Sequence, residues 1–305
     1  MKKTMILALG GNMIKKAREK GTFEEQYKNV NESCEQIVKI IKQGWNVIIT
    51  TGNGPQVGNL LLQQESSKDE IPPMPLDVCG ALSQGEIGYL VQQILRNKLK
   101  RNKIDKKVVT VITQVLVDKN DPEFSNPSKP IGPFYDKRNN RFQMVHQTGK
   151  GWRRVVPSPN PKGIIEREQI KDLLEEGDIV ITCVGGGIPV IESRGELRGV
   201  EGVIDKDLAS ERLAEELGVK TMMILTDVDH VYLNYGKRNQ RKLDKVKLKE
   251  LKEYQKEGHF PKGSMGPKIE ASIRLLESGG ERIFITSPGL ATKCLKGKAG
   301  TTLIV

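Results

Sequence analysis

The sequence predicts an α/β protein with a mostly parallel sheet that helices cover on both faces. Two observations carry this prediction: short apolar, β-branched runs recur along the 305 residues, and helical patterns lie between them. Strands that alternate with helices pair in parallel and are buried on both sides. At about 100 to 200 residues per domain, the length allows two ordinary domains or one large α/β unit.

Six apolar runs are expected to form buried strands, and each ends in a loop that contains Gly, Asp, Ser or Pro. They are Thr4–Leu9, Asn46–Thr51, Val108–Val117, Ile179–Val184, Thr221–Thr226 and Arg282–Thr286.

Helices are expected between these strands, because apolar residues recur there at three-and-four spacing. The first apolar stripe runs from Tyr27 to Ile41. Ser83 and Glu86 form a capping-box pattern that predicts the start of another helix. Further helices are expected at Ile165–Glu176, Lys206–Leu217 and Pro267–Ser278.

The segment 119–162 interrupts this alternation, because it is rich in Pro, Asn and basic residues. A loop of that length inside a compact chain usually forms a lid or a binding excursion. Apolar residues such as Ile131, Phe134 and Trp152 supply enough surface to fold it. The sequence therefore predicts an inserted lid subdomain.

The net charge of +11 suits an anionic partner such as nucleic acid, a membrane or a phosphorylated small molecule. The lysine-rich stretches 96–107 and 237–252 lack the interleaved aromatic residues that stack on bases, so nucleic-acid binding is not expected. No stretch approaches the roughly 18 apolar residues of a membrane span, and the first residues lead into no cleavage site. We expect a cytoplasmic protein without a membrane partner.

The cysteines are expected to be reduced thiols, because they are widely spaced and no histidine stands at metal-ligand spacing from them. They are Cys34, Cys79, Cys183 and Cys294. No protein-bound metal site is expected, and the few histidines offer no obvious partner for a cysteine or serine nucleophile.

Glycine-rich loops follow three of the predicted strands: Gly10-Gly11-Asn12, Gly52-Asn53-Gly54 and Gly185-Gly186-Gly187. In open parallel sheets, ligands bind beyond the carboxyl ends of the strands. Glycine lets several backbone N–H groups approach one anion. The coincidence of the three loops predicts an anion-binding cradle at one edge of the sheet.

Two common nucleotide-binding patterns do not account for these loops. The spacing of Gly52, Gly54 and Gly58 is similar to a dinucleotide fingerprint, but it follows the second strand, and the next acid, Asp77, does not end a strand. A dehydrogenase is therefore not favoured. A P-loop is absent from the sequence, so any ATP chemistry must use another scaffold.

Three lysines stand in rigid settings that suit the stabilisation of a transferring phosphoryl group. Lys129 lies in the proline-rich lid, Lys206 stands between two acids at the start of a helix, and Lys268 follows Pro267 at the start of another. Asp207 is placed to orient two of these lysines. A solvated surface lysine needs no such setting, so these three are the candidate catalytic cations.

Seven motifs, at residues 8–12, 51–59, 75–81, 129–135, 151–159, 202–210 and 258–268, form one specific pattern. On these motifs the chain resembles the carbamate kinases of the amino acid kinase family from Ala8 to Thr302. Other members of that family carry a lysine just before the first glycine pair, whereas this chain has Ala8-Leu9 there and offers Lys129 in the lid, which is the carbamate kinase arrangement.

The resemblance implies an αβα sandwich, a homodimer and reversible phosphoryl transfer between ATP and carbamate, giving ADP and carbamoyl phosphate. It implies Mg²⁺ bound through the nucleotide phosphates and a reaction run toward ATP synthesis in arginine catabolism. It also implies a carbamate-binding lobe over residues 1–200, with the lid at about 119–162, and a nucleotide-binding lobe over 201–305, on one continuous sheet. Carbamate is already a nucleophile, so no general base is required.

The resemblance also implies roles for individual residues. The transferring phosphoryl group would be held by Gly10, Gly11 and Asn12, and carbamate would be received by Gly52, Asn53 and Gly54. The transition state would be neutralised by Lys129, Lys206 and Lys268, with Asp207 ordering them. Asp227 and Tyr232 would face the ribose and the adenine, with Gly263 and Met265 near the phosphates; for Tyr232, packing beneath the loop is an equal alternative.

Two other hypotheses remain. The same fold can act on another carboxylate or phosphate acceptor, although the missing first-strand lysine and the lid motif argue against this. Alternatively, the chain is a nucleic-acid-binding or regulatory module with a degenerate kinase fold, although the presence of all three lysines argues against that.

Overall fold

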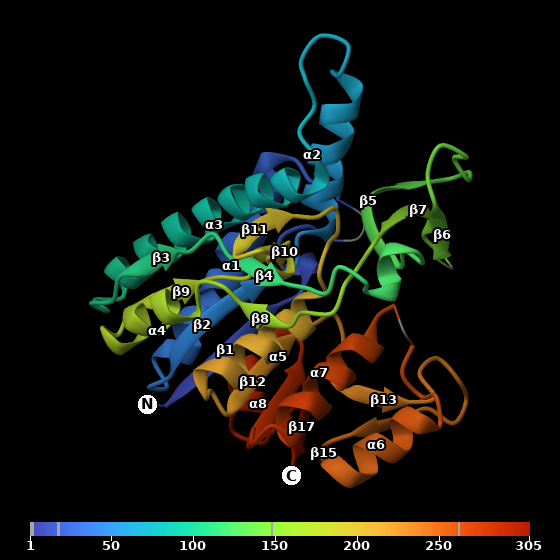
Figure 1. Cartoon of the computed structure of the whole chain (residues 1–305). Coiled ribbons are helices and arrows are strands. Elements are labelled where there is room, and N and C mark those ends of the chain that lie inside the picture. Colours follow the sequence, from blue (N-terminus) through green and yellow to red (C-terminus); the bar gives the residue numbers. More distant parts are fainter. Residues whose placement is uncertain (1–2, 17–18, 148, 262) are drawn as a thin grey trace.

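A computed structural model describes residues 3–16, 19–147, 149–261 and 263–305, apart from the side chain of Asn12, and contains a central eight-stranded sheet (Figure 1). The strands of this sheet are β1 (Thr4–Leu9), β2 (Asn46–Thr51), β3 (Val108–Thr110), β9 (Ile179–Ile181), β12 (Thr221–Leu225), β15 (Lys245–Lys247), β16 (Arg282–Thr286) and β17 (Thr301–Ile304). Their order is β15-β17-β16-β12-β1-β2-β9-β3. Only β16 and β17 pair antiparallel, so the prediction of a mostly parallel sheet is confirmed.

Helices cover both faces of this sheet, which gives the αβα sandwich. One face packs against α1 (Phe23–Ile41), α3 (Leu76–Arg101) and α8 (Ala291–Cys294), and the other against α4 (Arg167–Glu175), α5 (Lys206–Leu217) and α7 (Met265–Glu277). Successive side chains of β1 point to opposite faces of the sheet, so this one strand contributes apolar residues to both layers. Ile6 and Ala8 join the apolar cluster of α5 and α7, whereas Met5, Leu7 and Leu9 join that of α1 and α3.

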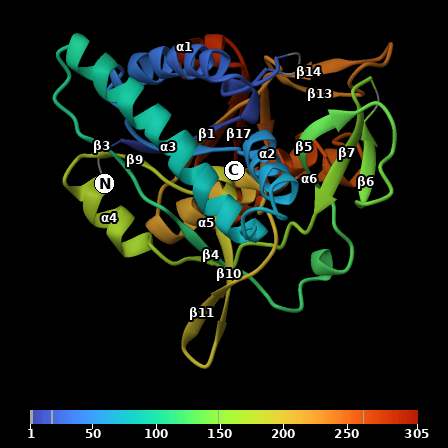
Figure 2. The same cartoon turned by 90° about the horizontal axis from the view of Figure 1, so that it is seen from above.

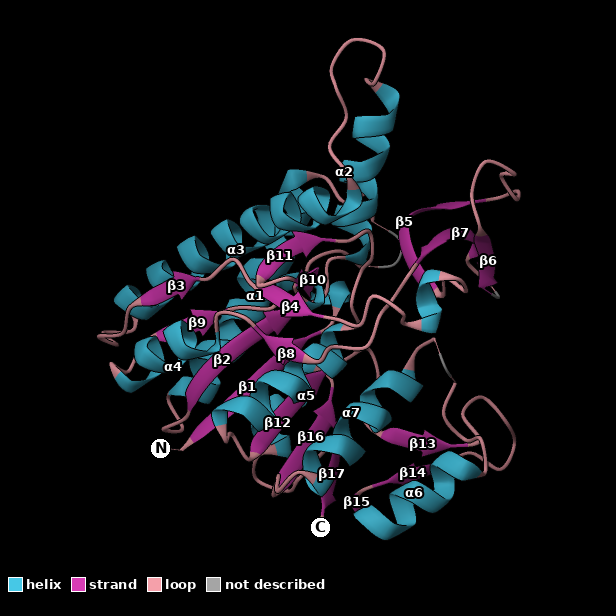
Figure 3. Ribbon diagram, in the orientation of Figure 1, coloured by secondary structure: helices cyan, strands magenta, loops and turns pink. Residues whose placement is uncertain are grey.

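Two further helices lie at the margins of these layers. In Figure 3, α2 (Gly54–Ser66) rises beyond the sheet, and α6 (Leu248–Lys256) lies beside β15. Leu251 of α6 joins the apolar cluster of α4, α5 and α7. No helix in the described ranges is long and apolar enough to cross a membrane.

The segment assigned to the lid carries a separate antiparallel sheet. Its strands are β5 (Lys129–Tyr135), β6 (Met144–Gln147) and β7 (Gly151–Val156), in the order β5-β7-β6, and Figure 2 shows them beside α2 and apart from the central sheet. The base of the lid packs tightly on α2, because a Cβ added to Gly58 would lie 2.0 Å from the backbone nitrogen of Gly132. This close contact fixes the lid strand that begins with Lys129.

Several short strands were not predicted, although β4 (Gln114–Leu116) falls within the predicted run Val108–Val117. A four-stranded sheet has the order β11-β10-β4-β8, formed by β4, β8 (Gly163–Ile164), β10 (Ile188–Ser193) and β11 (Glu196–Gly199). A hairpin of β13 (Val231–Leu233) and β14 (Arg241–Leu243) lies in the second half of the chain.

Two predicted elements were wrong. The run Val108–Val117 is not one strand, because β3 pairs with β9 in the central sheet while β4 pairs with β10 in the other sheet. Ser83 does not begin a helix either, since α3 already starts at Leu76. The Ser83 hydroxyl instead donates to the carbonyl of Gly80 inside that helix, 2.7 Å away.

Two predicted strands end earlier than expected: β9 stops at Ile181 and β12 stops at Leu225. The residues that follow bend into the loops at the edge of the sheet. The division into a carbamate-binding and a nucleotide-binding lobe stays a prediction.

Candidate active site

A cavity of about 280 Å³ lies at the edge of the central sheet where β1, β2 and β12 end. Its glycine-rich wall comes from the loops after β1 and β2. The lid, the loops after β9 and β12, the start of α5 and the start of α7 supply the rest. The predicted site residues that line it are Gly10, Gly11, Gly52, Asn53, Gly54, Lys129, Lys206, Asp207, Asp227, Gly263 and Lys268.

Close packing brings the loops together. A Cβ on Gly52 would lie 3.4 Å from the backbone nitrogen of Gly11, and one on Gly10 would lie 2.9 Å from the carbonyl oxygen of Leu225. At Gly185, where φ is +70°, a Cβ would lie 2.1 Å from Nδ2 of Asn53. A side chain at Gly10 or Gly185 would force its neighbours to move, and one at Gly52 would press closely on the next loop, so these glycines let the loops pack around this end of the cavity.

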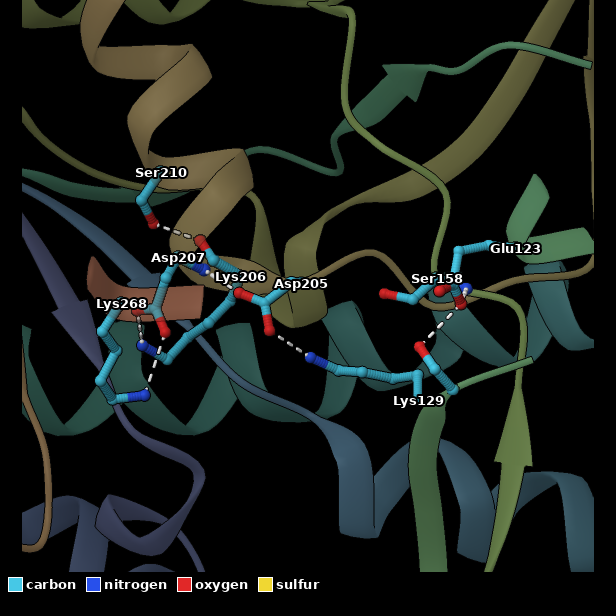
Figure 4. A network of polar contacts seen from close by, with 9 residues as sticks. Glu123, Lys129, Ser158, Asp205, Lys206, Asp207, Ser210 and Lys268 are labelled. Atoms are coloured by element: carbon cyan, nitrogen blue, oxygen red, sulfur yellow. Dashed lines mark hydrogen bonds and ion pairs between the residues drawn. The ribbon is translucent and has the colours of Figure 1, made fainter. Parts of the chain in front are cut away.

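Asp207 links two of the predicted catalytic lysines, as Figure 4 shows. Its Oδ1 accepts from Nζ of Lys206 at 2.5 Å, and its Oδ2 accepts from Nζ of Lys268 at 3.0 Å. Asp207 is only 2% exposed and Lys206 only 7%. One buried carboxylate therefore holds two ammonium groups from different helices at one end of the cavity.

The first turn of α5 sets the position of these groups. Asp205 is the N-cap residue, and its Oδ1 accepts from the backbone N–H of Asp207 at 2.9 Å. Ser210 donates to the carbonyl of Lys206 at 2.6 Å and lies 2.6 Å from the hydroxyl of Thr50 on β2. This chain of hydrogen bonds ties the start of α5 to the sheet.

Lys129 joins the lid to the body of the protein. Its Nζ donates to Oδ2 of Asp205 at 2.5 Å, so both oxygens of the N-cap carboxylate are used (Figure 4). The ion pair is partly exposed, and both residues line the cavity. The lid lysine consequently reaches the same helix start as the other two lysines.

The charges in this cluster shift one another's pKa values. Burial opposes the charge of Asp207, but the ammonium groups of Lys206 and Lys268 outweigh it and hold the pKa of this carboxyl well below its usual range. Burial also lowers the pKa of Lys206, although Asp207 opposes this effect. Burial also opposes the charge of Lys268, but the carboxylates of Asp207, Asp205 and Asp227 together outweigh it and raise the pKa of this lysine.

Three predicted site residues do not lie in this cavity's described wall. The Tyr232 hydroxyl donates to Oδ1 of Asp229 at 2.7 Å, and Met265 packs against the apolar cluster of α5 and α7. The side chain of Asn12 lies outside the described part of the chain.

Sequence reasoning missed two charged residues of the cavity, Asp205 and Arg153. An acid just before a helix is a common N-cap, which was the available signal for Asp205. Arg153 belongs to the motif at residues 151–159, but nothing in its local sequence shows that it faces the cavity.

The cavity is built to hold anions. Among the described residues, four cationic side chains line it, from Lys129, Arg153, Lys206 and Lys268, against three acidic ones, from Asp205, Asp207 and Asp227. Fixed cations and backbone amides of this kind stabilise charge that develops on phosphoryl oxygens. A larger cavity of about 780 Å³, between the lid and α2, contains none of the predicted site residues.

Comparisons with known proteins agree with this arrangement. The model of the amino acid kinase family matches residues 3–287. A carbamate kinase of Thermococcus kodakarensis is 52% identical over 99% of both chains, and one of Pyrococcus furiosus is 51% identical over 100% of both. The structure of Giardia lamblia carbamate kinase bound to AMP-PNP is 44% identical, with a TM-score of 0.92, over 99% of this chain and 98% of that one.

Proposed function

Because the chain belongs to the amino acid kinase family, we propose that it transfers a phosphoryl group reversibly between ATP and carbamate. A carbamate oxygen forms the new bond to the γ-phosphorus while the bond from that phosphorus to the bridging oxygen breaks. ADP leaves and carbamoyl phosphate forms, without removal of a proton. We propose that the cell uses the reverse direction, toward ATP, in arginine catabolism.

The observation that carries this proposal is the sharing of Asp207 by Lys206 and Lys268 beside the glycine loops. Two ammonium groups held by one buried carboxylate are already in place when negative charge develops on the transferring oxygens. The amide of Gly11 holds the phosphoryl group. Gly10, whose own N–H donates to the carbonyl oxygen of Leu225 at 2.9 Å, lets the loop approach it closely, and Asn12 is a further predicted contact. The loop of Gly52, Asn53 and Gly54 receives carbamate.

Lys129 contributes from the lid. Its ammonium group, paired with Asp205, lines the cavity. It adds a cation on the side opposite α7 and excludes water when the lid covers the substrates.

The nucleotide lies over the loop that follows β12. Asp227 and Gly263 line the cavity on this side, which supports their placement near the ribose and the phosphates. Tyr232 and Met265 lie outside its described wall, so a contact of Tyr232 with adenine requires the nucleotide to extend along β13.

Mg²⁺ enters on the nucleotide. In the described residues, no group of three or more His, Cys, Asp or Glu side chains is placed to hold a metal ion. Asp227 is the acid that lines the cavity on the nucleotide side, and it is the residue that would meet a metal carried on the phosphate oxygens. The ion would neutralise charge on the transferring phosphates.

We also propose a homodimer. Leu82 and Tyr89, seven residues apart on α3, share a helix face and are 45% and 59% exposed. Light scattering during size-exclusion chromatography tests this proposal. A measured mass of 34.0 kDa, which is that of a single chain, would exclude the dimer.

A coupled assay for ATP formation from ADP, Mg²⁺ and carbamoyl phosphate tests the reaction. Acetyl phosphate is the control donor, and Lys268→Ala is the blank, with an expected loss of about 10²–10³ in kcat. Fast turnover with carbamoyl phosphate that depends on Lys268 supports the proposal. No turnover by folded wild-type protein refutes it and favours another carboxylate or phosphate acceptor.

A further inference from the structure

Arg153 differs from the other cations of the active-site cavity. Lys129 pairs with Asp205, and Lys206 and Lys268 share Asp207. Among the residues that the structure describes, no carboxylate is paired with Arg153 in this way. Burial alone lowers its pKa to about 10, so the guanidinium remains charged at neutral pH.

The lid holds this guanidinium in one position. Its Nε donates to the carbonyl oxygen of Gly132 at 2.9 Å, and its Cζ lies 5.1 Å from the ring centre of Phe134. The pairing register of β5 and β7 shifts between Ile131 and Tyr135. Such a shift interrupts the backbone hydrogen bonds between the two strands, so the carbonyl of Gly132 can accept from a side chain instead. Gly132 in turn packs on Gly58 of α2, so the anchor of Arg153 is itself fixed.

The outer edge of the guanidinium faces the loop after β2. A Cβ added to Gly54 would lie 3.6 Å from Nη2 of Arg153 and 3.4 Å from the carbonyl oxygen of Pro130. Because Nε is already used, the two Nη groups remain to meet a ligand in the cavity. A planar fork of donors suits a carboxylate-like group better than a lysine ammonium does.

We propose that Arg153 is the acceptor-binding residue of this site: its Nη groups donate to the carbamate oxygen that does not attack phosphorus. This oxygen becomes the carbonyl oxygen of carbamoyl phosphate, so the contact is kept in both directions of the reaction. In the reverse direction, it stabilises the carboxylate charge that develops as carbamate departs. The inference rests on the proposed function.

Kinetics of Arg153→Gln and Arg153→Lys test the proposal, with ADP and carbamoyl phosphate varied separately. Loss of a hydrogen bond to a charged group is expected to raise the KM for carbamoyl phosphate about 10- to 100-fold. The KM for ADP should change by less than about twofold, because the nucleotide lies on the other side of the cavity. Arg153→Lys should fall between Arg153→Gln and wild type, and added guanidinium ions should partly rescue Arg153→Gln.

Arg154→Gln is the matched control. Arg154 is the next residue of β7, but its Nη1 pairs with Glu65 at 2.7 Å and its side chain lines the larger cavity between the lid and α2. Its loss should leave the KM for carbamoyl phosphate unchanged. If Arg153→Gln and Arg154→Gln raise the KM for carbamoyl phosphate equally, the proposal is overturned. It is also overturned if Arg153→Gln raises the KM for carbamoyl phosphate and the KM for ADP equally, because Arg153 then has a structural role only.

Labelling of the wild-type protein covers the case in which Arg153→Gln does not fold. Phenylglyoxal modifies exposed guanidinium groups, and mass spectrometry of the peptides locates the modification. Carbamoyl phosphate should protect Arg153, whereas ADP should not; absence of this protection refutes the proposal. If wild-type protein itself does not turn over carbamoyl phosphate, the proposed function fails instead.

Discussion

The substitution Asp207→Asn tests how one buried carboxylate organises the active site. The replacement keeps the shape of the side chain but removes the charge that both Lys206 and Lys268 contact, at 2.5 and 3.0 Å. Two ammonium groups are then left close together with no acid between them. Removal of one partner from a buried ion pair costs about 3–5 kcal/mol of stability. For 305 residues, this corresponds to a fall in Tm of about 5–8 °C.

The same substitution should change the pH dependence of activity. Burial lowers the pKa of Lys206 and the Asp207 carboxylate opposes it, so removing the carboxylate charge lowers this pKa further. Lys268 loses the attraction that raises its own pKa. Both lysines then lose their protons at lower pH, and the alkaline limb of the kcat profile should move to lower pH. At neutral pH, we expect a loss of about 10²–10³ in kcat.

The coupled assay across pH and calorimetric melting measure these effects. Asp118→Asn is the matched control, because Asp118 pairs with Lys162 at the same 2.5 Å but at an exposed site. This control should keep the wild-type activity, pH profile and Tm. If Asp207→Asn keeps kcat within about threefold of wild type, or if its alkaline limb does not move, the two lysines do not depend on Asp207 and the reasoning is wrong.

Two further predictions concern packing and the thiols. Gly58→Ala should detach the lid base from α2, because its Cβ would lie 2.0 Å from the nitrogen of Gly132; kcat/KM should fall, and stability should drop by about 1–3 kcal/mol. Gly80→Ala is the control, because its new Cβ meets nothing within 4 Å beyond its own helix backbone and chain neighbours. It should leave kcat/KM unchanged, and in urea melts stability should rise by about 0.5–1 kcal/mol, because Ala favours the interior of α3 over Gly. Native protein should not react with a disulfide reagent for thiols such as DTNB, because all cysteines are buried, and burial raises the pKa values of Cys34 and Cys183 to about 12. Four thiols should appear after denaturation, and rapid reaction of the native protein would contradict the burial.

Much of the central sheet was predictable, because its strands are continuous apolar runs with turn residues after them. β1, β2 and β16 have the predicted bounds, and α5 begins at Lys206 and ends at Leu217 as expected. The same patterns failed for Val108–Val117, since an apolar run does not reveal that its halves pair in two different sheets. The start of α3 was missed because Ser83 resembles a cap in sequence but bonds inside the helix.

The sequence by itself determined which chemistry this protein offers: glycine loops after strands, and lysines at helix starts beside an acid. Local residue types carry that information, because backbone freedom and helix ends depend on neighbouring residues. Only the tertiary structure decided that Asp207 reaches both Lys206 and Lys268, that Lys129 pairs with Asp205, and that Arg153 faces the cavity. The contact of Lys268 with Asp207 joins residues 61 positions apart, and that of Lys129 with Asp205 joins residues 76 positions apart. Their geometry follows from how the lid, α5 and α7 pack around the end of the sheet.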